Sequence, residues 1–402
     1  MFNALHSFLM SPWVYGLAHA LTAWQYVLIT FGCVQLSMFS VTLYLHRDAA
    51  HRAVDLHPAL RHLARFWIWF TSGMVTREWV AVHRKHHAYS DVAGDPHSPV
   101  QYGLKKILLE GAEVYREAAF DPAVTAKYGH GTPDDWVERQ VYRRRNLGIV
   151  LMILTQLLLF GAVGIIMLAV VLITMPLIAA GVINGVGHAI GYRNFECDNA
   201  ARNVLPWGLL VGGEELHNNH HAFPSSAKFA LRPWEIDIGW AALCVFSALG
   251  LAKVRRVAPR PTTTAARAQV DLELVKALIA TRLDVLRDYT QRVTLPTLNA
   301  EARRRAGEFN RRMRHLLVRH PMMLDSAARQ RLEELLARSV ELRTVHEFRD
   351  RLATLWSGRL GQNDKLVAHL REWMQQAEAS GIESLRAFAE RLRGYQVAGM
   401  VA

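Results

Sequence analysis

Three histidine-rich segments are the part of this sequence best suited to chemistry. They are HRDAAH at residues 46–51, HRKHH at residues 83–87 and HNNHH at residues 217–221. In the second and third segments the histidines recur at positions i, i+3 and i+4, so on a helix all three lie on one face. Three imidazoles directed at one point suit a metal ion, because neutral imidazole is the commonest metal ligand in proteins. These segments therefore predict a metal site.

The first segment has a different spacing, with its two histidines five residues apart. On a regular helix those side chains would diverge by roughly 140°. His46 and His51 could then serve two ions, or one ion if the helix frays at this point. Asn184 and His188 form a further i, i+4 pair, which we expect to contribute to the same site.

The candidate ligands are nine histidines: His46, His51, His83, His86, His87, His188, His217, His220 and His221. Nine imidazoles are too many for one ion and suit two ions with about four to five protein ligands each. Imidazole binds zinc, copper, iron and nickel alike, whereas calcium and magnesium prefer oxygen ligands. We favour iron, because a nitrogen-rich site for two metals with open positions suits oxygen chemistry.

Composition indicates two parts of different character. The 402 residues are 51% hydrophobic, yet the formal net charge is +12. This mixture predicts an apolar membrane part beside a basic soluble part. The three cysteines form no pair, which argues against a disulfide framework and fits a reducing compartment. The chain does not open with the pattern of a signal peptide, so none is predicted.

Long uncharged segments predict membrane crossings. Residues 24–45 suit one crossing, and residues 147–183 suit two with a turn around residues 160–164. A shorter stretch, 64–82, is expected to cross or return, and residues 1–22 to lie at the membrane surface. Because a hairpin returns the chain to the side it left, all histidine segments should share one face. The polar loops are rich in Lys and Arg, so that face is predicted to be cytoplasmic.

The last third of the chain differs from the rest. Residues 259–266, which include PRPTTT, are typical of a linker between a membrane domain at 1–258 and a basic accessory region at 267–402. In that region apolar residues recur at helical spacing among dense Arg and Glu, which predicts roughly four to six helices. Its end, AEASGIESLRAFAERLRGYQ, resembles the helical tails of some bacterial transposases. No acidic catalytic residues accompany it in a matching frame, so nucleic acid is not a predicted partner.

The histidine segments and their surroundings resemble the integral-membrane fatty acid desaturases, specifically the Δ9 (stearoyl-type) branch. The likeness spans about residues 20–255 and includes EW before the second segment, DPH after it, GYR after His188 and FP after the third segment. It implies an all-α fold: a membrane-embedded four-helix bundle with a cytoplasmic cap holding two metals, followed by a soluble helical region. It also implies a bacterial inner-membrane protein whose active site faces the cytoplasm.

The resemblance implies an oxygen-dependent enzyme that introduces a cis double bond, at Δ9, into a saturated acyl chain. Two irons would be held by the nine histidines, with dioxygen as co-substrate and Asn184 holding a metal-bound water. We expect His97 and Glu214 to form hydrogen bonds with ligand imidazoles, although an ordinary surface role suits them equally well.

Four aromatic residues are candidates for the lining of an acyl tunnel: Trp67, Trp69, Trp79 and Tyr192. Aromatic residues at the end of a span also act as interfacial anchors, so both roles remain open.

One departure from the family concerns the headgroup of the substrate. Animal acyl-CoA desaturases carry an Arg-Asp pair just before the second histidine segment, where it helps to seat the thioester headgroup. Here Ala81 and Val82 take those positions, so a phospholipid-bound acyl chain remains an alternative to acyl-CoA. The chain has no haem-binding cassette, no GxGxxG after a strand and no cysteine run. Electrons are therefore expected from a separate ferredoxin- or cytochrome-type donor with its reductase.

Two other functions fit parts of the same pattern. An alkane or carotenoid hydroxylase-type monooxygenase uses similar metals, although HRDAAH and DPH favour desaturation. A catalytically silent membrane protein that binds a partner through its tail would hold little iron.

Overall fold

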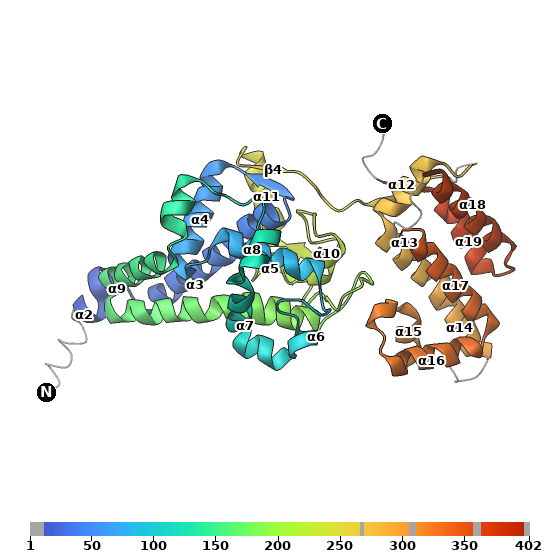
Figure 1. Ribbon diagram of the computed structural model, residues 1–402, viewed down its shortest axis with the longest axis horizontal. Helices are drawn as coiled ribbons and strands as arrows, with labels where there is room; N and C mark the ends of the chain where they lie inside the picture. Colours follow the sequence, from blue (N-terminus) through green and yellow to red (C-terminus); the bar gives the residue numbers. More distant parts are fainter. Residues whose placement is uncertain (1–11, 266–268, 305–310, 357–362, 398–402) are drawn as a thin grey trace. The chain divides into compact units, whose positions relative to one another are not determined.

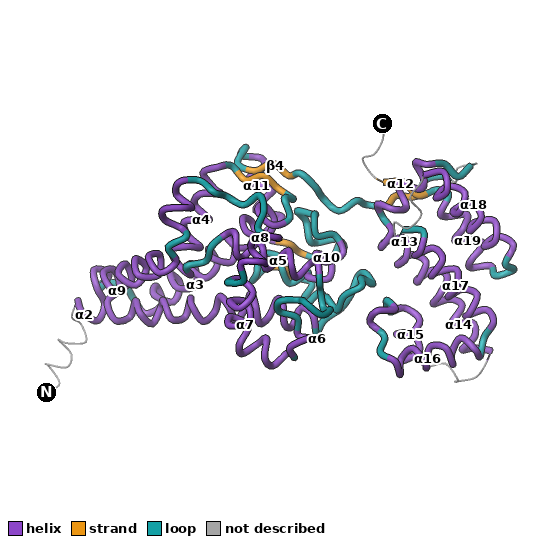
Figure 2. Tube along the Cα trace, viewed as in Figure 1, coloured by secondary structure: helices purple, strands orange, loops and turns teal. Residues whose placement is uncertain are grey.

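The computed structural model describes residues 12–265, 269–304, 311–356 and 363–397 (Figure 1). The chain divides into two compact units. The first comprises residues 1–193 and 200–258, and the second comprises residues 194–199 and 259–402. Helices dominate both units, with short strands between them (Figure 2), which confirms the predicted helical class.

The first membrane-crossing candidate is a continuous helical segment, Ala23–Ala50. It begins as the α-helix α3 (Ala23–Phe39) and continues as a π-helix, η2 (Ser40–Ala50). A capping box at Thr22 and Gln25 fixes its start. Residues 24–45 were predicted as one crossing, and the structure confirms that they belong to one helix long and apolar enough to cross a membrane.

The second membrane-crossing candidate is a hairpin within Arg145–His188. It is formed by α9 (Arg145–Pro176), the π-helix η4 (Leu177–Gly185) and the short η5 (Val186–His188). Figure 1 shows the two antiparallel limbs of α9.

The chain reverses at Gly161, whose φ of 59° few other residues adopt. A Cβ added at Gly164 would lie 2.2 Å from the carbonyl oxygen of Gln156, which shows how tightly the limbs meet. The turn predicted around residues 160–164 is confirmed. Helix α2 (Pro12–Tyr15) packs against this bend.

The stretch 64–82, which was expected to cross the membrane or to return, is divided between two helices. Helix α4 (Pro58–Ser72) ends at Gly73, which adopts a left-handed conformation with a φ of 64°. Helix α5 (Thr76–Ala88) then starts in a new direction and carries the second histidine segment. A glycine C-cap therefore divides what hydrophobicity alone presents as continuous.

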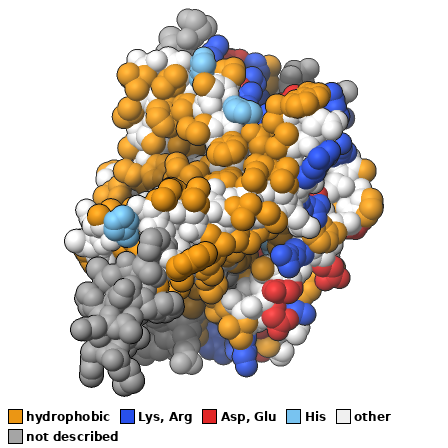
Figure 3. Space-filling view, turned by 90° about the vertical axis from the view of Figure 1, so that its left-hand side faces the viewer, with side chains coloured by type: hydrophobic (Ala, Val, Ile, Leu, Met, Phe, Trp, Pro, Cys, Tyr) orange, Lys and Arg blue, Asp and Glu red, His pale blue; other side chains and the backbone are white. Residues whose placement is uncertain are grey.

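Large hydrophobic side chains are exposed along the two membrane-crossing candidates. They include Trp24, Leu28 and Phe31 on α3, and Leu154, Leu158, Ile166 and Ile173 on α9. Figure 3 looks onto this end of the first unit, where hydrophobic side chains form a broad surface and charged side chains gather along one side. An apolar surface of this kind suits contact with lipid.

Shorter elements complete the first unit. They are α6 (Pro99–Tyr102), α7 (Leu104–Ala119), α8 (Pro122–Tyr128), η3 (Glu138–Tyr142), α10 (His217–Ala222) and α11 (Ile238–Ala248). Strand β1 (Val54–Leu56) pairs antiparallel with β4 (Ala252–Val254), and β2 (Trp207–Gly208) pairs parallel with β3 (Ile236–Asp237). The β1–β4 pair ties the chain after the first histidine segment to the chain after α11.

The second unit is a helical bundle with its own core. Its helices are α12 (Leu272–Ala280), α13 (Arg282–Tyr289), η6 (Thr290–Thr294), α14 (Leu295–Arg304), α15 (Arg311–Val318), η7 (Pro321–Met323), α16 (Ser326–Ala337), α17 (Val340–Thr354), α18 (Asn363–Ala379) and α19 (Glu383–Leu392). Tyr289, Trp373 and Phe388 form the aromatic centre of the core. The described residues thus contain more helices than the four to six expected.

Part of the predicted linker is structured. Within residues 259–266, strand β5 (Pro261–Thr263) pairs antiparallel with β6 (Tyr395–Val397), near the other end of the second unit. Backbone pairing therefore fixes these three residues of the predicted linker to the bundle.

Candidate metal centre

The nine candidate histidines gather into two groups in the first unit. The group of five contains His46, His51, His83, His87 and His220, and the group of four contains His86, His188, His217 and His221. In each group the ligating atoms lie within 4.8 Å of one another. Seven of the nine side chains are buried, and those of His51 and His87 are half-buried. Long-range folding therefore brings η2, α5, η5 and α10 together at one place.

Distances between ring nitrogens match those of ligands that share an ion. In the group of five, the Nε2 of His220 lies 3.0 Å from that of His46 and 2.9 Å from that of His87. In the group of four, the Nε2 of His217 lies 3.0 Å from that of His188 and 3.2 Å from that of His221. Imidazole nitrogens about 2.0–2.1 Å from an ion, as for zinc, would be about 3.0–3.4 Å apart at neighbouring positions.

The π-helix explains how the first histidine segment reaches one group. The backbone N–H of His51 donates to the carbonyl of His46 at 3.0 Å, which is the i→i+5 bond of a π-helix. Residues five apart therefore lie on the same side, and both histidines join the group of five. This geometry fits the alternative in which both histidines serve one ion, which stays a prediction, and π-helical winding brings the two rings together.

Each of the two later segments divides its histidines between the groups, which corrects the expectation that three imidazoles aim at one point. Helix α5 supplies His83 and His87 to the group of five and His86 to the group of four. In α10, His217 and His221 join the group of four, while His220 joins the group of five. The i, i+4 pair stays together in each helix, and the remaining histidine faces the other group.

Buried carboxylates hold three of the rings. The Nδ1 of His46 lies 2.7 Å from Glu214, that of His86 lies 3.0 Å from Asp95, and that of His188 lies 2.8 Å from Asp91. A carboxylate accepts the Nδ1–H and so leaves the Nε2 lone pair directed into the group. Several lone pairs facing one another repel unless a cation lies between them. The donor set therefore fits metal ions.

Burial sets the protonation states that metal binding requires. It lowers the pKa of His51, His83 and His87 well below the ordinary value, and neighbouring imidazoles lower it further. For His217, His220 and His221, burial lowers the pKa in the same way. These rings are therefore neutral, the form in which imidazole binds a metal.

The supporting carboxylates are ionised. Burial alone would raise the pKa of Asp91, but the hydrogen bond and charge of His188 hold it well below its usual range. The pKa of Glu214 is likewise lowered, because the charges and hydrogen bonds of its neighbours, led by His46, outweigh burial. Both side chains are thus able to accept Nδ1–H bonds.

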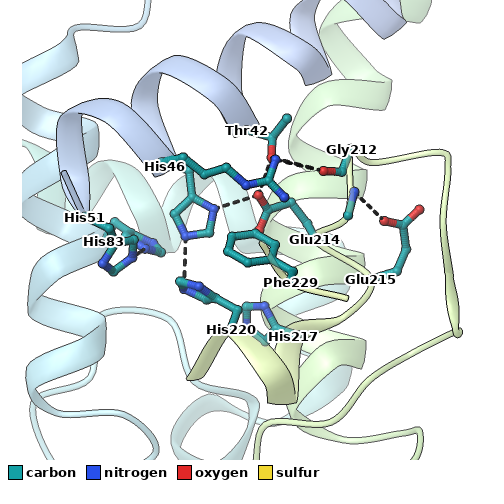
Figure 4. A network of polar contacts seen from close by, with 12 residues as sticks. Thr42, His46, His51, His83, Gly212, Glu214, Glu215, His217, His220 and Phe229 are labelled. Atoms are coloured by element: carbon teal, nitrogen blue, oxygen red, sulfur yellow. Dashed lines mark hydrogen bonds and ion pairs between the residues drawn. The ribbon is translucent and has the colours of Figure 1, made fainter. Parts of the chain in front are cut away.

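Glu214 also belongs to a network that joins η2 to the chain before α10 (Figure 4). Thr42 donates to Glu214 at 2.5 Å, and Arg47 donates to the carbonyl of Gly212 at 3.1 Å. Arg47 is fully buried and forms an ion pair with Asp237 at 3.0 Å. These contacts fix the position of His46 relative to His220.

His97 and Asn184 lie next to the group of four. The Nδ2 of Asn184 lies 3.3 Å from the Nδ1 of His97, whose ring centre is 4.6 Å from that of His86. Among the described residues His97 forms no hydrogen bond with a ligand imidazole, so that expectation is corrected. Burial lowers the pKa of His97 to about 3, which keeps it neutral.

Asp91 is the functional residue that sequence reasoning missed. It accepts from His188, from the hydroxyl of Ser98 at 2.6 Å and from the backbone N–H of Ala200 at 2.7 Å. Asp95 was noted only as part of a motif and supports His86. The available signal was a pair of aspartates four residues apart, directly after the second histidine segment.

The predicted tunnel residues lie in different surroundings. The ring of Trp79 stacks on His83 with centroids 4.9 Å apart. The indole N–H groups of Trp67 and Trp69 donate to Ser37 and to the carbonyl of Arg144, respectively. Tyr192 donates to Glu235 at 2.7 Å. Only Trp79 of these four has a ring contact with the histidine groups, and the tunnel role of all four stays a prediction.

Comparisons with known proteins agree with this geometry. A model of the family described as fatty acid desaturase matches residues 21–237. Delta-9 desaturase-like 5 protein of Arabidopsis thaliana is 31% identical over 250 residues, which cover 57% of this chain and 76% of the relative. Delta-9 acyl-lipid desaturase 2 of the same plant is 28% identical, covering 57% and 74%. Hex-5-enoyl-[acyl-carrier protein] acetylenase of Moorena producens (strain JHB) is 30% identical, covering 56% and 74%.

A second family model, described as transposase, matches residues 274–399. This range lies in the second unit and includes the C-terminal sequence that resembles transposase tails.

Proposed function

Because the chain belongs to the fatty acid desaturase family, and is thus an acyl desaturase and an oxidoreductase, we propose that it introduces a cis double bond at Δ9 into a saturated acyl chain. The observation that carries this proposal is the convergence of nine imidazoles into a group of five and a group of four. Each group would hold one iron ion.

The bound metals would supply the oxidant, generated from dioxygen and two external electrons, that breaks an unactivated C–H bond. The protein supplies the geometry. Glu214, Asp91 and Asp95 fix the tautomer and orientation of the rings that they contact. The Nδ2 of Asn184 is directed at the Nδ1 of His97. Its Oδ1 is left to accept from a metal-bound water, which is the role that we propose for Asn184.

Burial of the site should exclude bulk water. Phe229 covers the rings of His46 and His220, with ring centres 5.5 and 4.9 Å away, and Trp79 covers His83 from another side. Apolar walls of this kind favour an acyl chain over a polar substrate. We propose that Trp79 contacts the chain near the metals.

The substrate that we propose is a phospholipid-bound acyl chain. Ala81 and Val82 are apolar and fully buried, so they offer no polar contact to a thioester headgroup. Acyl-lipid desaturases among the relatives support this choice. Electrons would come from a separate ferredoxin- or cytochrome-type carrier, and the site would face the cytoplasm of a bacterial inner membrane, as the Lys- and Arg-rich loops suggest.

Expression in a host that lacks its own desaturase tests the proposal. Mass spectrometry of the host lipids should detect new monounsaturated chains, and the purified protein should hold about two irons, one for each group. Hydroxylated chains without unsaturated ones would favour a monooxygenase. A protein that contains only zinc and leaves the lipids unchanged would contradict the proposal.

A further inference from the structure

A cavity of about 700 Å³ lies in the first unit beside the metal centre. Its walls come from the end of η2, the start of α4, residues 131–135 and Arg255. Asp48 and Ala49 of η2 line it, while His46 and His51 of the same segment belong to the group of five. The volume is within the range of small-molecule sites, about 300–1,000 Å³.

Three of the four guanidinium groups of the cavity are paired with carboxylates. Arg61 binds both oxygens of Asp48 at 2.7 Å. In the same way Arg65 is paired with Asp135 at 2.6 Å, and Arg255 is paired with Asp55. The fourth carboxylate of the lining, Asp134, is paired with Arg143 at 2.6 Å. Every carboxylate of the cavity therefore already has a cationic partner.

Arg52, the fourth, is different. Within the described parts of the chain it forms no hydrogen bond or ion pair, although it lines the cavity and is exposed. Its φ of 52° is uncommon for a residue with a side chain. Such strained conformations cluster at functional sites. Gly131 leaves room for the guanidinium, since a Cβ there would lie 1.8 Å from its Nη2 atom.

A second uncompensated cation lies close by. Arg84 donates to the backbone carbonyls of Ala49, Ala50, Tyr128 and His130 at 2.7–3.0 Å. It also lies 3.5 Å from the Nδ1 of His130, and it contacts no carboxylate among the described residues. It therefore adds positive charge next to the cavity without adding a carboxylate. The Arg52 side of the cavity thus favours an anion.

We propose that this cavity binds the phosphate-bearing headgroup of the lipid whose acyl chain is desaturated. Guanidinium groups form strong paired hydrogen bonds with phosphate oxygens, and Arg52 is free to make them. The cavity reaches Tyr44, within the membrane-crossing candidate Ala23–Ala50, so a lipid could place its headgroup here while its chain stays in the apolar part. This inference rests on the proposed function, since it identifies the carrier of the acyl chain.

Native mass spectrometry of the purified full chain tests the site directly. The probes are dioleoylphosphatidylglycerol, neutral dioleoylglycerol with the same chains, and inorganic phosphate. Arg52→Gly removes the guanidinium and suits the positive φ, so this variant should keep its fold. Arg116→Ala, at an exposed arginine of α7, is the matched control.

Arg52→Gly should weaken binding of dioleoylphosphatidylglycerol by about 10- to 100-fold, as expected for loss of a charge-assisted hydrogen bond. Arg52→Lys should lose less, and Arg116→Ala should match the wild type. Binding of dioleoylglycerol should not depend on Arg52. Equal phospholipid affinity in all variants would overturn the proposal.

The other outcomes distinguish a lipid headgroup from free phosphate, and they distinguish failure of the cavity proposal from failure of the proposed function. Inorganic phosphate that displaces the lipid at similar concentration would assign the cavity to free phosphate and overturn the headgroup role. Binding that depends on Arg52 in a protein that forms no unsaturated product would support the site and refute the proposed function. Desaturation that persists with unchanged KM for the lipid in Arg52→Gly would refute the site alone.

Discussion

The two histidine groups share their helices but differ in what supports them. In the group of four, buried aspartates hold two of the rings, those of His86 and His188. In the group of five, His46 alone among the described ligands has a carboxylate partner. Each group also holds one buried ring whose Nδ1 has no hydrogen-bond partner among the described residues, His217 in the group of four and His220 in the group of five. A hydrogen bond to Nδ1 fixes the orientation of a ring. The smaller group is thus oriented by charge, and the larger one by packing and by ligand number.

Aromatic contacts take the place of carboxylates in the group of five. Trp79 stacks on His83, and Phe229 lies against His220. Loss of one carboxylate should therefore lower iron affinity more in the group of four than in the group of five. Loss of a histidine ligand that lies close to two others should lower it most. The following predictions are ordered accordingly.

The largest effect should come from His220→Ala. The Nε2 of this ring lies close to the Nε2 atoms of both His46 and His87, so its removal takes away the candidate metal ligand between them. We expect unsaturated product to fall below detection and iron content to drop from about two ions to about one, measured by mass spectrometry and metal analysis. His369→Ala, at an exposed histidine of the second unit, is the control. Full activity in His220→Ala would remove this ring from the ligand set.

Asp91→Asn should have the next largest effect. Both oxygens of Asp91 already accept hydrogen bonds, so an amide would place N–H groups against a donor. Metal affinity in the group of four should fall by about 10- to 100-fold. Iron retained during dialysis against a chelator measures this change. The control is Glu113→Gln, at an exposed residue of α7. If Asp91→Asn retains as much iron as this control, the group of four does not depend on the Asp91 carboxylate.

Glu214→Gln should have a smaller effect than Asp91→Asn. The same oxygen, Oε1, accepts from Thr42 and His46, and a glutamine keeps one such acceptor. We expect a loss of iron affinity of about tenfold or less, measured by the same dialysis. A loss greater than that of Asp91→Asn would reverse the contrast between the groups.

Trp373→Ala should leave both groups unaffected. Trp373 is buried in the core of the second unit and donates to the carbonyl of Phe348 at 2.9 Å. Its loss should destabilise that unit by about 3–5 kcal/mol, visible as earlier unfolding or faster proteolysis of residues 259–402. Iron content should not change, because every histidine of the two groups lies in the first unit. Parallel loss of iron would show that the units are coupled.

Local signals in the sequence were sufficient for several elements. The uncharged run of residues 147–183 predicted the hairpin and its turn, and the uncharged run of residues 24–45 predicted the first long apolar helix. Each of these depends on the composition of neighbouring residues. The division between α4 and α5 was missed, because one glycine ended the helix within a stretch that stays apolar on both sides.

The sequence by itself determined the helical class, the apolar segments and the nine imidazoles that suit metal. Only the tertiary structure decided which imidazole joins which group, that η2 winds as a π-helix, and that Asp91 supports His188. The physical reason is distance along the chain. Periodicity shows on which side of a helix neighbouring residues lie. The ligand groups, and the hydrogen bonds that orient their rings, instead form between segments tens to more than a hundred residues apart.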